Sequence, residues 1–468
     1  MSSGVFFRFI FFLILSLIAP PLPNSGAAEA ERAKIIADAA AAWNEAQSIE
    51  KRIVPPRFPD RDFPITQFGA VADGVTDCTG AFREAIAACE RAGGGRVFVP
   101  EGTFRTGAIH LRSGVNLHLA KNATIRFSTD PKHFLPVVFA RFESTEVMNY
   151  SPFIYAFEQE NIAITGQGRL DGQASASVWH QWKQSGREDE KKLVQMGDDG
   201  VPVAQRIFGE RGKLRPNFIQ PIRCKNILIE GITVVDSPMW AINPVYCTNV
   251  TIRGVTVDTK GRHGKAPNTD GCNPESSTDV LIEHCAFNTD DDCIAIKAGR
   301  DADGRRVNIS CQNILIRNCQ FQAGHGGVTA GSETAAGIRN VFIEQCRFDS
   351  PNLRMAIRVK TNPRRGGFIE RFYVRHCTVK TAEVGIHMTM RYDRVTEGGA
   401  IPRVGQIAIS DVVFEQLKQA IFLEGLTEDA RIAEVAIVNC TFRNTRQKSA
   451  LVHTRDVHLV NTTGTGLE

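Results

Sequence analysis

The sequence is poor in aromatic residues and carries almost no excess of charge. Aromatic residues make up 8% of the 468 residues, with only 5 Tyr and 4 Trp. The formal net charge is +4, with acidic and basic residues interspersed, which excludes a general electrostatic attraction to nucleic acid. By contrast, the chain has 40 Gly. This abundance favours many tight turns around an aliphatic core over a helical bundle.

One apolar run stands at the N-terminus, from Val5 to Ala19. Arg8 supplies a positive charge, and small residues follow at 24–28. The run is short for a membrane span and ends at prolines. We therefore predict a cleaved signal peptide over residues 1–28, and a secreted or periplasmic protein with no stable membrane anchor. A signal anchor is the alternative.

The twelve cysteines show no zinc-finger spacing, so a metal site is not expected. Export would permit disulfides. However, several cysteines lie within apolar strand patterns, among them Cys285, Cys319 and Cys346. We favour free thiols buried as small hydrophobic groups and stacked in a core.

A short pattern recurs along the chain: a polar residue, a strand that alternates apolar and polar residues, and a small turn. Clear copies begin at Asn226, Asn249 and Asp279, and degenerate copies continue to Asp456. Earlier copies start at Asn116 and Asn161. From Asn226 onward, successive copies are 22 to 35 residues apart. A period of this size indicates a solenoid.

The type of solenoid follows from the composition of the repeat. A leucine-rich repeat would need its Leu frame and an intervening helix, and neither is present. The strands are instead rich in Val, Ile and Thr, with turn-like linkers. We predict an all-β protein, a right-handed parallel β-helix over residues 60–468.

Three segments depart from the repeat. Residues 79–92 have helical periodicity, with Thr79 or Asp77 as N-cap and Gly93 as the stop, and a helix there would cap the open end of the solenoid. Residues 29–59 are expected to form a helical segment and an extended linker. Residues 173–216 are expected to be a long loop inserted between coils.

Four polar clusters fall in successive copies of the repeat, separated by 21, 34 and 33 residues. Residues one coil apart lie about 4.8 Å apart along the axis of a solenoid. The spacing therefore predicts one surface that holds carboxylates, an imidazole and two cations. The clusters are Asn268-Thr269-Asp270-Gly271, Asp290-Asp291-Asp292-Cys293, Gly324-His325-Gly326 and Arg358-Val359-Lys360.

Each cluster alone has a simpler interpretation. Asn-Thr-Asp-Gly is a good turn sequence, and the Asp290–Asp292 run could be a solvated corner or a calcium loop. Together they fit glycoside hydrolysis, which needs an acid at the leaving oxygen and a base or nucleophile on the opposite face of the sugar. Crowded carboxylates separate their pKa values, so that one stays protonated. Arg358 and Lys360 would bind a negatively charged substrate.

The sequence resembles the polygalacturonase family, glycoside hydrolase family 28, over about residues 54–460. All four clusters match motifs of the family, the second as Asp291-Asp292-Cys293-Ile-Ala-Ile-Lys. The N-terminal match includes the stretches 68–77 and 93–102.

The resemblance implies the site residues and their roles. Asp291 would be the general acid, and Asp270 and Asp292 would activate water for single displacement with inversion. His325 would tune the acid or bind substrate. Asn268, Arg358, Lys360 and Tyr392 would bind galacturonate, with no metal or other cofactor. The expected partner is an acidic polysaccharide or oligosaccharide, and the protein is expected to be a monomer.

Some features depart from the family pattern or refine it. Asp290 stands where the family usually has Gly. The stretch 326–334 resembles the bacterial, often exo-acting branch, and the insertion at 173–216 could wall off one end of a groove. Further possible substrate contacts are Glu333, Arg339, Trp179 and Trp182.

Other activities remain open at this point. The expected substrate is galacturonan, with rhamnogalacturonan or xylogalacturonan as alternatives. Pectate lyase chemistry is a rival that would need calcium. A non-catalytic glycan-binding β-helix is a rival of another class, and it would not require the three aspartates.

Overall fold

The repeated polar residue begins each coil because it occupies a left-handed turn. The computed structural model describes residues 25–261 and 265–468. Asn226, Asn249 and Asp279 have φ values of 57°, 59° and 56°, a conformation that Asn and Asp tolerate better than most residues. Their side chains also bond from coil to coil: Asn249 Nδ2 donates to Asn226 Oδ1 at 2.8 Å. The repeat therefore stacks through an asparagine ladder.

One early copy of the repeat is out of register. Asn116 pairs with Ala163 rather than with Asn161. Gly114, with φ of 76°, takes the left-handed position in that coil instead. Glycine adopts this conformation without steric cost, so the turn is kept although its polar side chain is missing.

The strand that follows each ladder residue belongs to a long parallel sheet, which we call sheet A. It joins 14 strands, almost all one coil apart. These are β1 (Asp62–Pro64), β3 (Gly95–Val99), β6 (Val115–Leu119), β11 (Glu160–Gly166), β14 (Lys225–Glu230), β16 (Thr248–Arg253), β18 (Thr278–Glu283), β21 (Cys311–Arg317), β23 (Ile338–Glu344), β26 (Phe368–Arg375), β28 (Arg403–Val404), β29 (Ile407–Ser410), β31 (Ile432–Val438) and β34 (Thr454–Val460).

A second parallel sheet of 16 strands, sheet B, follows the turn after sheet A. Its strands are β2 (Asp73–Asp77), β4 (Gly102–Thr106), β7 (Ala123–Phe127), β12 (Arg169–Asp171), β15 (Thr233–Val235), β17 (Thr256–Asp258), β19 (Ala286–Asn288), β20 (Ile294–Ile296), β22 (Gln320–Gly331), β24 (Arg347–Asp349), β25 (Leu353–Lys360), β27 (Thr378–Thr389), β30 (Val413–Glu424), β32 (Thr441–Gln447), β33 (Ala450–Val452) and β35 (Thr463–Gly464).

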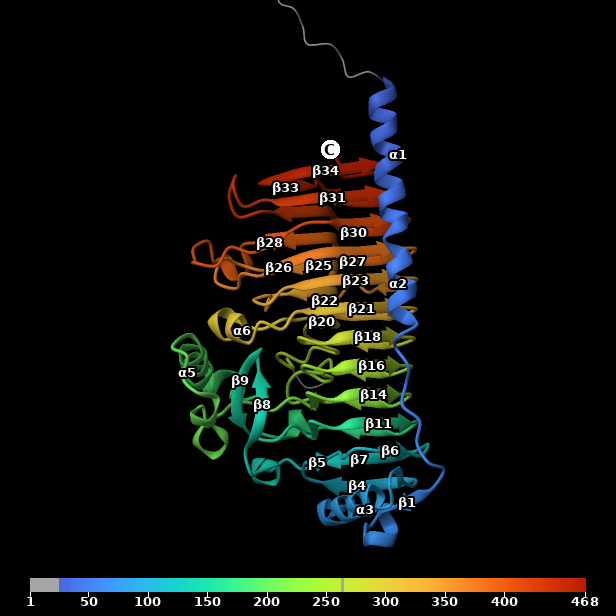
Figure 1. Cartoon of the computed structure of the whole chain (residues 1–468), viewed down its shortest axis with the longest axis vertical. Coiled ribbons are helices and arrows are strands. Elements are labelled where there is room, and N and C mark those ends of the chain that lie inside the picture. The colour runs from blue at the N-terminus through green and yellow to red at the C-terminus, as the bar shows by residue number, and fades with distance from the viewer. Residues whose placement is uncertain (1–24, 262–264) are drawn as a thin grey trace, which may run out of the picture.

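A third face starts with the parallel strands β5 (Ile109–His110), β10 (Ile154–Phe157) and β13 (Ile219–Ile222). Single bridges extend it through Ile242 and Cys272 to Ile294 of β20. The coils thus stack as a right-handed parallel β-helix, as predicted (Figure 1).

The core consists of side chains that point inward and stack from coil to coil. Ile227, Val250, Val280 and Ile314 lie on consecutive strands of sheet A and are 0 to 2% exposed. Burial of each such side chain contributes about 1.5–3 kcal/mol. All twelve cysteines are buried and free, which confirms the prediction of stacked thiols.

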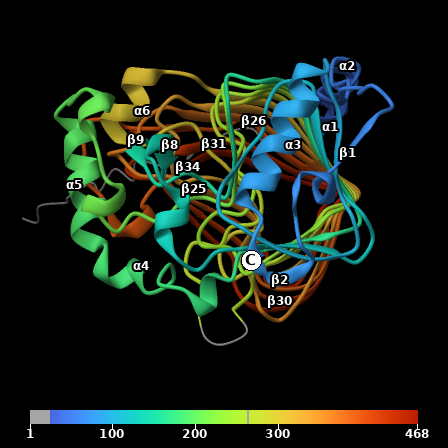
Figure 2. The ribbon, with the colours of Figure 1, turned by 90° about the horizontal axis from the view of Figure 1, so that it is seen from below.

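The N-terminal end of the β-helix is covered by α3 (Thr79–Arg91) (Figure 2). The helix buries Phe82, Ile86 and Cys89, as its periodicity predicts. The prediction of Thr79 or Asp77 as N-cap was wrong in detail. Cys78 occupies that position without a side-chain cap, and the Asp77 carboxylate instead accepts a hydrogen bond from the backbone N–H of Thr79 at 3.1 Å.

The predicted N-terminal helical segment is present as α1 (Ser25–Ala41) and α2 (Trp43–Glu50). Both helices run along the side of the solenoid (Figure 1). Trp43 and Ile49 are buried against Leu281, Leu315 and Phe342 of sheet A. The predicted signal peptide lies outside the described residues, except for residues 25–28 at the start of α1. No described helix is long and apolar enough to cross a membrane.

The prediction of a long loop at 173–216 was wrong in part. The insertion also contains two helices, α4 (Trp182–Ser185) and α5 (Arg187–Asp198). Glu188, Asp189 and Glu190 occupy the first turn of α5, where negative charges interact favourably with the positive end of the helix dipole. The insertion packs with an antiparallel hairpin, β8 (Val138–Phe142) and β9 (Thr145–Asn149), and with α6 (Asp301–Val307). These elements lie on the side opposite α1 and α2 (Figure 2).

Candidate active site

The four polar clusters lie on adjacent coils, as their spacing predicts. Cys272, just after Asp270, bridges Ile294, just after Asp292. Ile294 then pairs with Val328 of β22, and Val328 pairs with Ile357 of β25. Asp270, Asp291 and Asp292, His325, and Arg358 and Lys360 therefore follow one another along one face of the solenoid.

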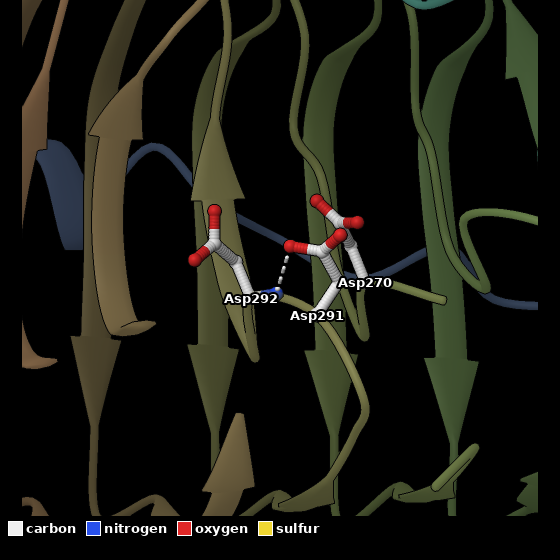
Figure 3. Close-up of side chains that lie close together, drawn as sticks. All are labelled: Asp270, Asp291 and Asp292. Carbon is white, nitrogen blue, oxygen red and sulfur yellow. Dashed lines mark hydrogen bonds between the residues drawn. The ribbon is translucent and has the colours of Figure 1, made fainter. Parts of the chain in front are cut away.

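The three aspartates converge just before the paired residues Cys272 and Ile294 of adjacent coils (Figure 3). One carboxylate oxygen of each lies within 4.8 Å of the others. Asp292 is completely buried and the Asp270 side chain is 4% exposed, whereas the Asp291 side chain is 20% exposed. Asp291 is therefore the carboxylate that a substrate can reach most directly.

Asp291 is held by its own turn and by the next coil. Its Oδ1 atom accepts a hydrogen bond from the backbone N–H of Asp292 at 2.9 Å. His325 Nδ1 lies 3.0 Å from the same oxygen. With its proton on Nδ1, the His325 ring donates a hydrogen bond to Asp291 and helps to orient this carboxylate.

Asp292 forms ion pairs with both predicted cations. Its carboxylate lies 2.7 Å from Lys360 Nζ and 3.1 Å from Arg358 Nη1. Burial alone would raise its pKa, but Lys360 and Arg358 together hold the pKa of Asp292 below the usual range. Asp292 is therefore firmly ionised.

Asp270 is in the opposite electrostatic state. Burial, followed by the neighbouring charge of Asp291, raises the pKa of Asp270 well above the usual range. Asn273 Nδ2 donates to its Oδ2 atom at 2.9 Å. The raised pKa favours the protonated form of Asp270 in the resting site.

The glycines of the third cluster make room for this arrangement. A Cβ atom on Gly326 would lie 2.8 Å from Asp292 Oδ1 and 2.1 Å from Thr329 Oγ1. A Cβ on Gly324 would lie 2.7 Å from the backbone carbonyl oxygen of Asp291. The Gly-His-Gly sequence therefore brings the His325 coil close enough to touch the aspartates.

Tyr392 and Asn268 lie beside the charged residues, each with a partner. The Tyr392 ring lies 4.9 Å from Lys360 Nζ and 5.7 Å from the Arg358 guanidinium carbon. Asn268 Oδ1 accepts a hydrogen bond from Arg215 Nη2 at 2.7 Å, so the insertion that contains Arg215 contacts the loop before Asp270.

Asp290 supports this loop rather than joining the three aspartates. Its Oδ2 atom accepts hydrogen bonds from the backbone N–H groups of Ala266 and Gly261, at 2.7 Å and 3.1 Å. The extra negative charge at this position is thus used to fix the chain that leads into Asn268 and Asp270.

The structure separates the other possible substrate contacts. Glu333 is close to the site, 2.8 Å from Lys297. Trp179 is wholly buried in the main core, and Trp182 packs against it. Arg339 does not lie at the site. It is on β23 of sheet A, where it donates a hydrogen bond to Gln312, so its interpretation as a substrate contact was wrong. Sequence spacing cannot show which sheet an isolated arginine belongs to.

Sequence reasoning missed Lys297 and Asn273 as neighbours of Asp270. Lys297 Nζ lies 4.0 Å from Asp270 Oδ2. Lys297 ends the Asp-Asp-Cys-Ile-Ala-Ile-Lys motif, so its parity along the strand could have placed it on the outer face. Lys297, Arg358 and Lys360 thus place three cations beside the three carboxyl groups.

The insertion is tied to the site through alternating charges. Lys183 of α4 lies 3.3 Å from both Glu143 and Glu190. Glu143, in the turn between β8 and β9, also pairs with Arg300 at 2.7 Å. These pairs hold the inserted helices against the coils that carry the aspartates.

Comparisons with known proteins agree with this chemistry. The profile of the family described as "Glycosyl hydrolases family 28" matches residues 202–422. A "Probable polygalacturonase" from Vitis vinifera is 31% identical over 380 residues, which cover 78% of this chain and 71% of that protein. An "Exo-poly-alpha-D-galacturonosidase" from Dickeya chrysanthemi is 27% identical, over 70% of this chain and 57% of that protein.

A solved structure is similar over almost the whole chain. It is a hyperthermoactive exopolygalacturonase from Thermotoga maritima, with a TM-score of 0.85 and 38% identity. The similarity covers 90% of this chain and 96% of that one.

Proposed function

The chain belongs to glycosyl hydrolase family 28 and is a glycoside hydrolase, and we propose that it cuts α-1,4-galacturonosyl linkages in polygalacturonate. The observation that carries this proposal is the trio Asp270, Asp291 and Asp292, with one oxygen of each within 4.8 Å of the others. The cations Arg358 and Lys360 lie beside it. The trio supplies acid and base, and the cations select an acidic sugar.

In this proposal Asp291 is the general acid. It is the most exposed of the three carboxyl groups and lies beside Asp270. Asp291 gives the proton to the leaving glycosidic oxygen as the bond to the anomeric carbon breaks. Asp292, and Asp270 once ionised, take a proton from the water that attacks this carbon. One water is consumed, and the reaction proceeds with inversion.

Substrate binding is assigned to the residues around Lys360. Arg358 pairs with Asp292 through Nη1, and a guanidinium has further N–H donors that can bind a sugar carboxylate. Tyr392 offers a ring that covers both cations. His325 and Asn268 border the trio and would contact the sugar at the scissile bond.

We further propose that the enzyme removes single residues from a chain end. The inserted helices are fixed beside the site through Arg215 and Glu143, where they can limit a substrate to one chain end. Two of the similar proteins, from Dickeya chrysanthemi and Thermotoga maritima, are exo-acting by name. Such an enzyme would act on extracellular pectin as an exported monomer.

The test is digestion of polygalacturonate and end-labelled oligogalacturonides, with product sizes followed over time. Galacturonate alone from the first time point is expected. A ladder of oligomers would indicate endo action, and cleavage of rhamnogalacturonan or xylogalacturonan alone would change the substrate. Unsaturated products that disappear with a chelator would indicate a lyase, and binding without cleavage would indicate an adhesin.

A further inference from the structure

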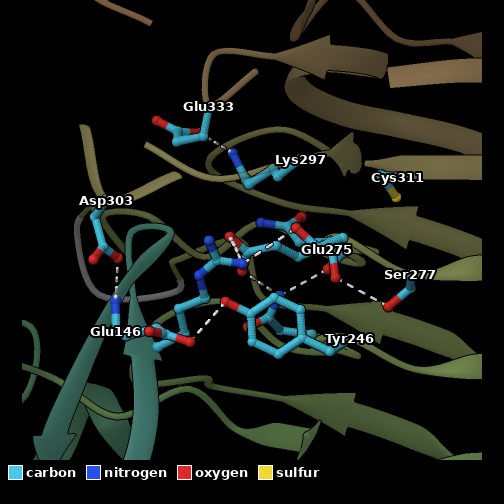
Figure 4. Close-up of polar contacts among 12 residues, drawn as sticks. Glu146, Tyr246, Glu275, Ser277, Lys297, Asp303, Cys311 and Glu333 are labelled. Atoms are coloured by element: carbon cyan, nitrogen blue, oxygen red, sulfur yellow. Dashed lines mark hydrogen bonds and ion pairs between the residues drawn. The ribbon is translucent and has the colours of Figure 1, made fainter. Parts of the chain in front are cut away.

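We propose that Lys297 is a positioning residue that favours ionisation of Asp270 when this carboxyl group acts as part of the base, and that Glu333 fixes Lys297 for this task. The inference rests on the proposed function, in which Asp270 is part of the base. It assigns a role to the buried ion pair between Lys297 and Glu333 (Figure 4).

Lys297 directly follows β20, one residue beyond its last strand residue, Ile296. It is 3% exposed. Its Nζ atom lies 2.8 Å from Glu333 Oε2 and 4.0 Å from Asp270 Oδ2, and it donates to the Gly331 carbonyl oxygen at 3.4 Å. The Trp240 ring closes another side, 4.6 Å away. A flexible ammonium group is thereby held at one point.

The charges around Asp270 show why this ammonium matters. Burial and then Asp291 raise the pKa of Asp270, and Lys297 is the strongest influence that lowers it. Lys360 lies closer to Asp292, which it pairs with at 2.7 Å. The charged groups that face Asp270 are Asp291 and Asp292 from the turn before β20, Lys297 after β20, Lys360 from β25 and Arg215 from the insertion.

Glu333 acts on Lys297 from the far side. It is held by Ser332 Oγ, which donates to its Oε1 atom at 2.8 Å, and by Arg365 at 3.7 Å. Burial alone would raise its pKa, but Lys297 and then Arg365 hold the pKa of Glu333 below the usual range, so it is ionised. Because Glu333 is nearer to Lys297 than Asp270 is, it both orients the ammonium and competes for its charge.

This arrangement predicts opposite effects for two substitutions. In Lys297→Met, Asp270 loses its nearest cation and ionises only at higher pH. In Glu333→Gln, a negative charge is removed and the ammonium acts more strongly on Asp270, which then ionises at lower pH. The acidic limb of the kcat/KM profile reports the ionisation of the base, so the limb should move in opposite directions.

The experiment measures kcat and KM for a trigalacturonate against pH in the wild type, Lys297→Met, Lys297→Arg and Glu333→Gln. For Lys297→Met, we expect the acidic limb of the kcat/KM profile to shift to higher pH by about one unit or more, with a lower kcat and little change in KM. Lys297→Arg keeps the charge and should shift the limb less. Glu333→Gln should shift the limb to lower pH.

Asp303→Asn is the matched control, because it removes another buried ion pair, to Arg206 at 2.7 Å, and should leave the limb in place. A higher KM with an unmoved limb in Lys297→Met would overturn the proposal and make Lys297 a substrate contact. If Lys297→Met does not fold, Glu333→Gln provides the test. An acidic limb that stays in place or moves to higher pH in Glu333→Gln would refute the proposal. An Asp270→Asn enzyme with full activity would instead refute the proposed function.

Discussion

Gly326 lies so close to Asp292 that a methyl group at position 326 would be 2.8 Å from the Asp292 Oδ1 oxygen. The same methyl group would lie 3.2 Å from Arg358 Cδ. Position 326 is therefore glycine because it faces the buried ion pair between Asp292 and Arg358, and not because its backbone turns.

We expect Gly326→Ala to displace this ion pair and to lower kcat/KM by about 100-fold, since misplacement of about 1 Å can cost that much. Steady-state kinetics on oligogalacturonides would measure the effect. Gly80→Ala is the control, because Gly80 lies in helix α3 with only the Arg83 side chain nearby. Equal activity of Gly326→Ala and the wild type would show that Asp292 needs no fixed position.

Asp290 and Asp291 are neighbours in sequence with different tasks, and substitution separates them. Asp291→Asn should lower kcat by about 10²–10⁴-fold, the usual contribution of a general acid, while stability changes little because the side chain is partly exposed. Asp290→Asn should retain most of the activity, since the Asp290 carboxylate accepts hydrogen bonds from the backbone of Gly261 and Ala266 and does not join the three aspartates. Kinetics and thermal unfolding of both variants provide the check. Comparable losses of kcat in Asp291→Asn and Asp290→Asn would contradict the assignment of Asp291 as the acid and of Asp290 as a structural support.

The coil arrangement and the adjacent positions of the aspartates could be predicted from sequence because the repeat is local. Most copies have their own ladder residue, such as Asn226 or Asn249, and the period places Asp270, Asp291 and His325 on successive coils. Physical regularity of this kind is visible in one sequence.

What lies outside the repeat could not be predicted in the same way. The helices of the insertion are held by contacts with distant residues, such as Lys183 with Glu143. Lys297 gains its significance only from Glu333 and Asp270, which stand 36 and 27 positions away in sequence. Its strand parity was visible, but its partners were not.

The salt bridges of Glu143 predict a pH-dependent link between the insertion and the solenoid. Burial opposes its ionisation, but Lys183 and Arg300 lower the pKa of Glu143 from 4.5 to about 2. A carboxylate whose pKa is lower in the folded state stabilises the protein above its unfolded pKa. This stabilisation is lost as the pH falls from about 4.5 to about 2.

Glu143→Gln should therefore lower the free energy of unfolding by on the order of 3 kcal/mol at neutral pH, and by much less near the folded pKa. Denaturant unfolding across this pH range would measure the difference. Glu188→Gln is the control, because its side chain is 85% exposed and should matter by less than about 0.5 kcal/mol. A difference that does not change with pH would contradict the assigned ion pairs.

The stereochemistry of the product distinguishes water from a carboxylate as the attacking group. One oxygen of each aspartate lies within 4.8 Å of the others, and two carboxyl groups about 5 Å apart are typical of retaining enzymes, in which one is the nucleophile. Here, however, Asp292 is completely buried and paired with Lys360 and Arg358, so its oxygens are not free to bond to carbon.

Asp270 is similarly unsuited to direct attack, because it is 3% exposed and Asn273 donates to its Oδ2 atom. We therefore expect water to attack and an α-linked substrate to give β-galacturonate first. Proton NMR of the anomeric signals during the first minutes, before the anomers equilibrate, would show it. The α-anomer appearing first would mean that a carboxylate bonds to the sugar, and Asp270 and Asp292 would then lose their assignment as the pair that activates water.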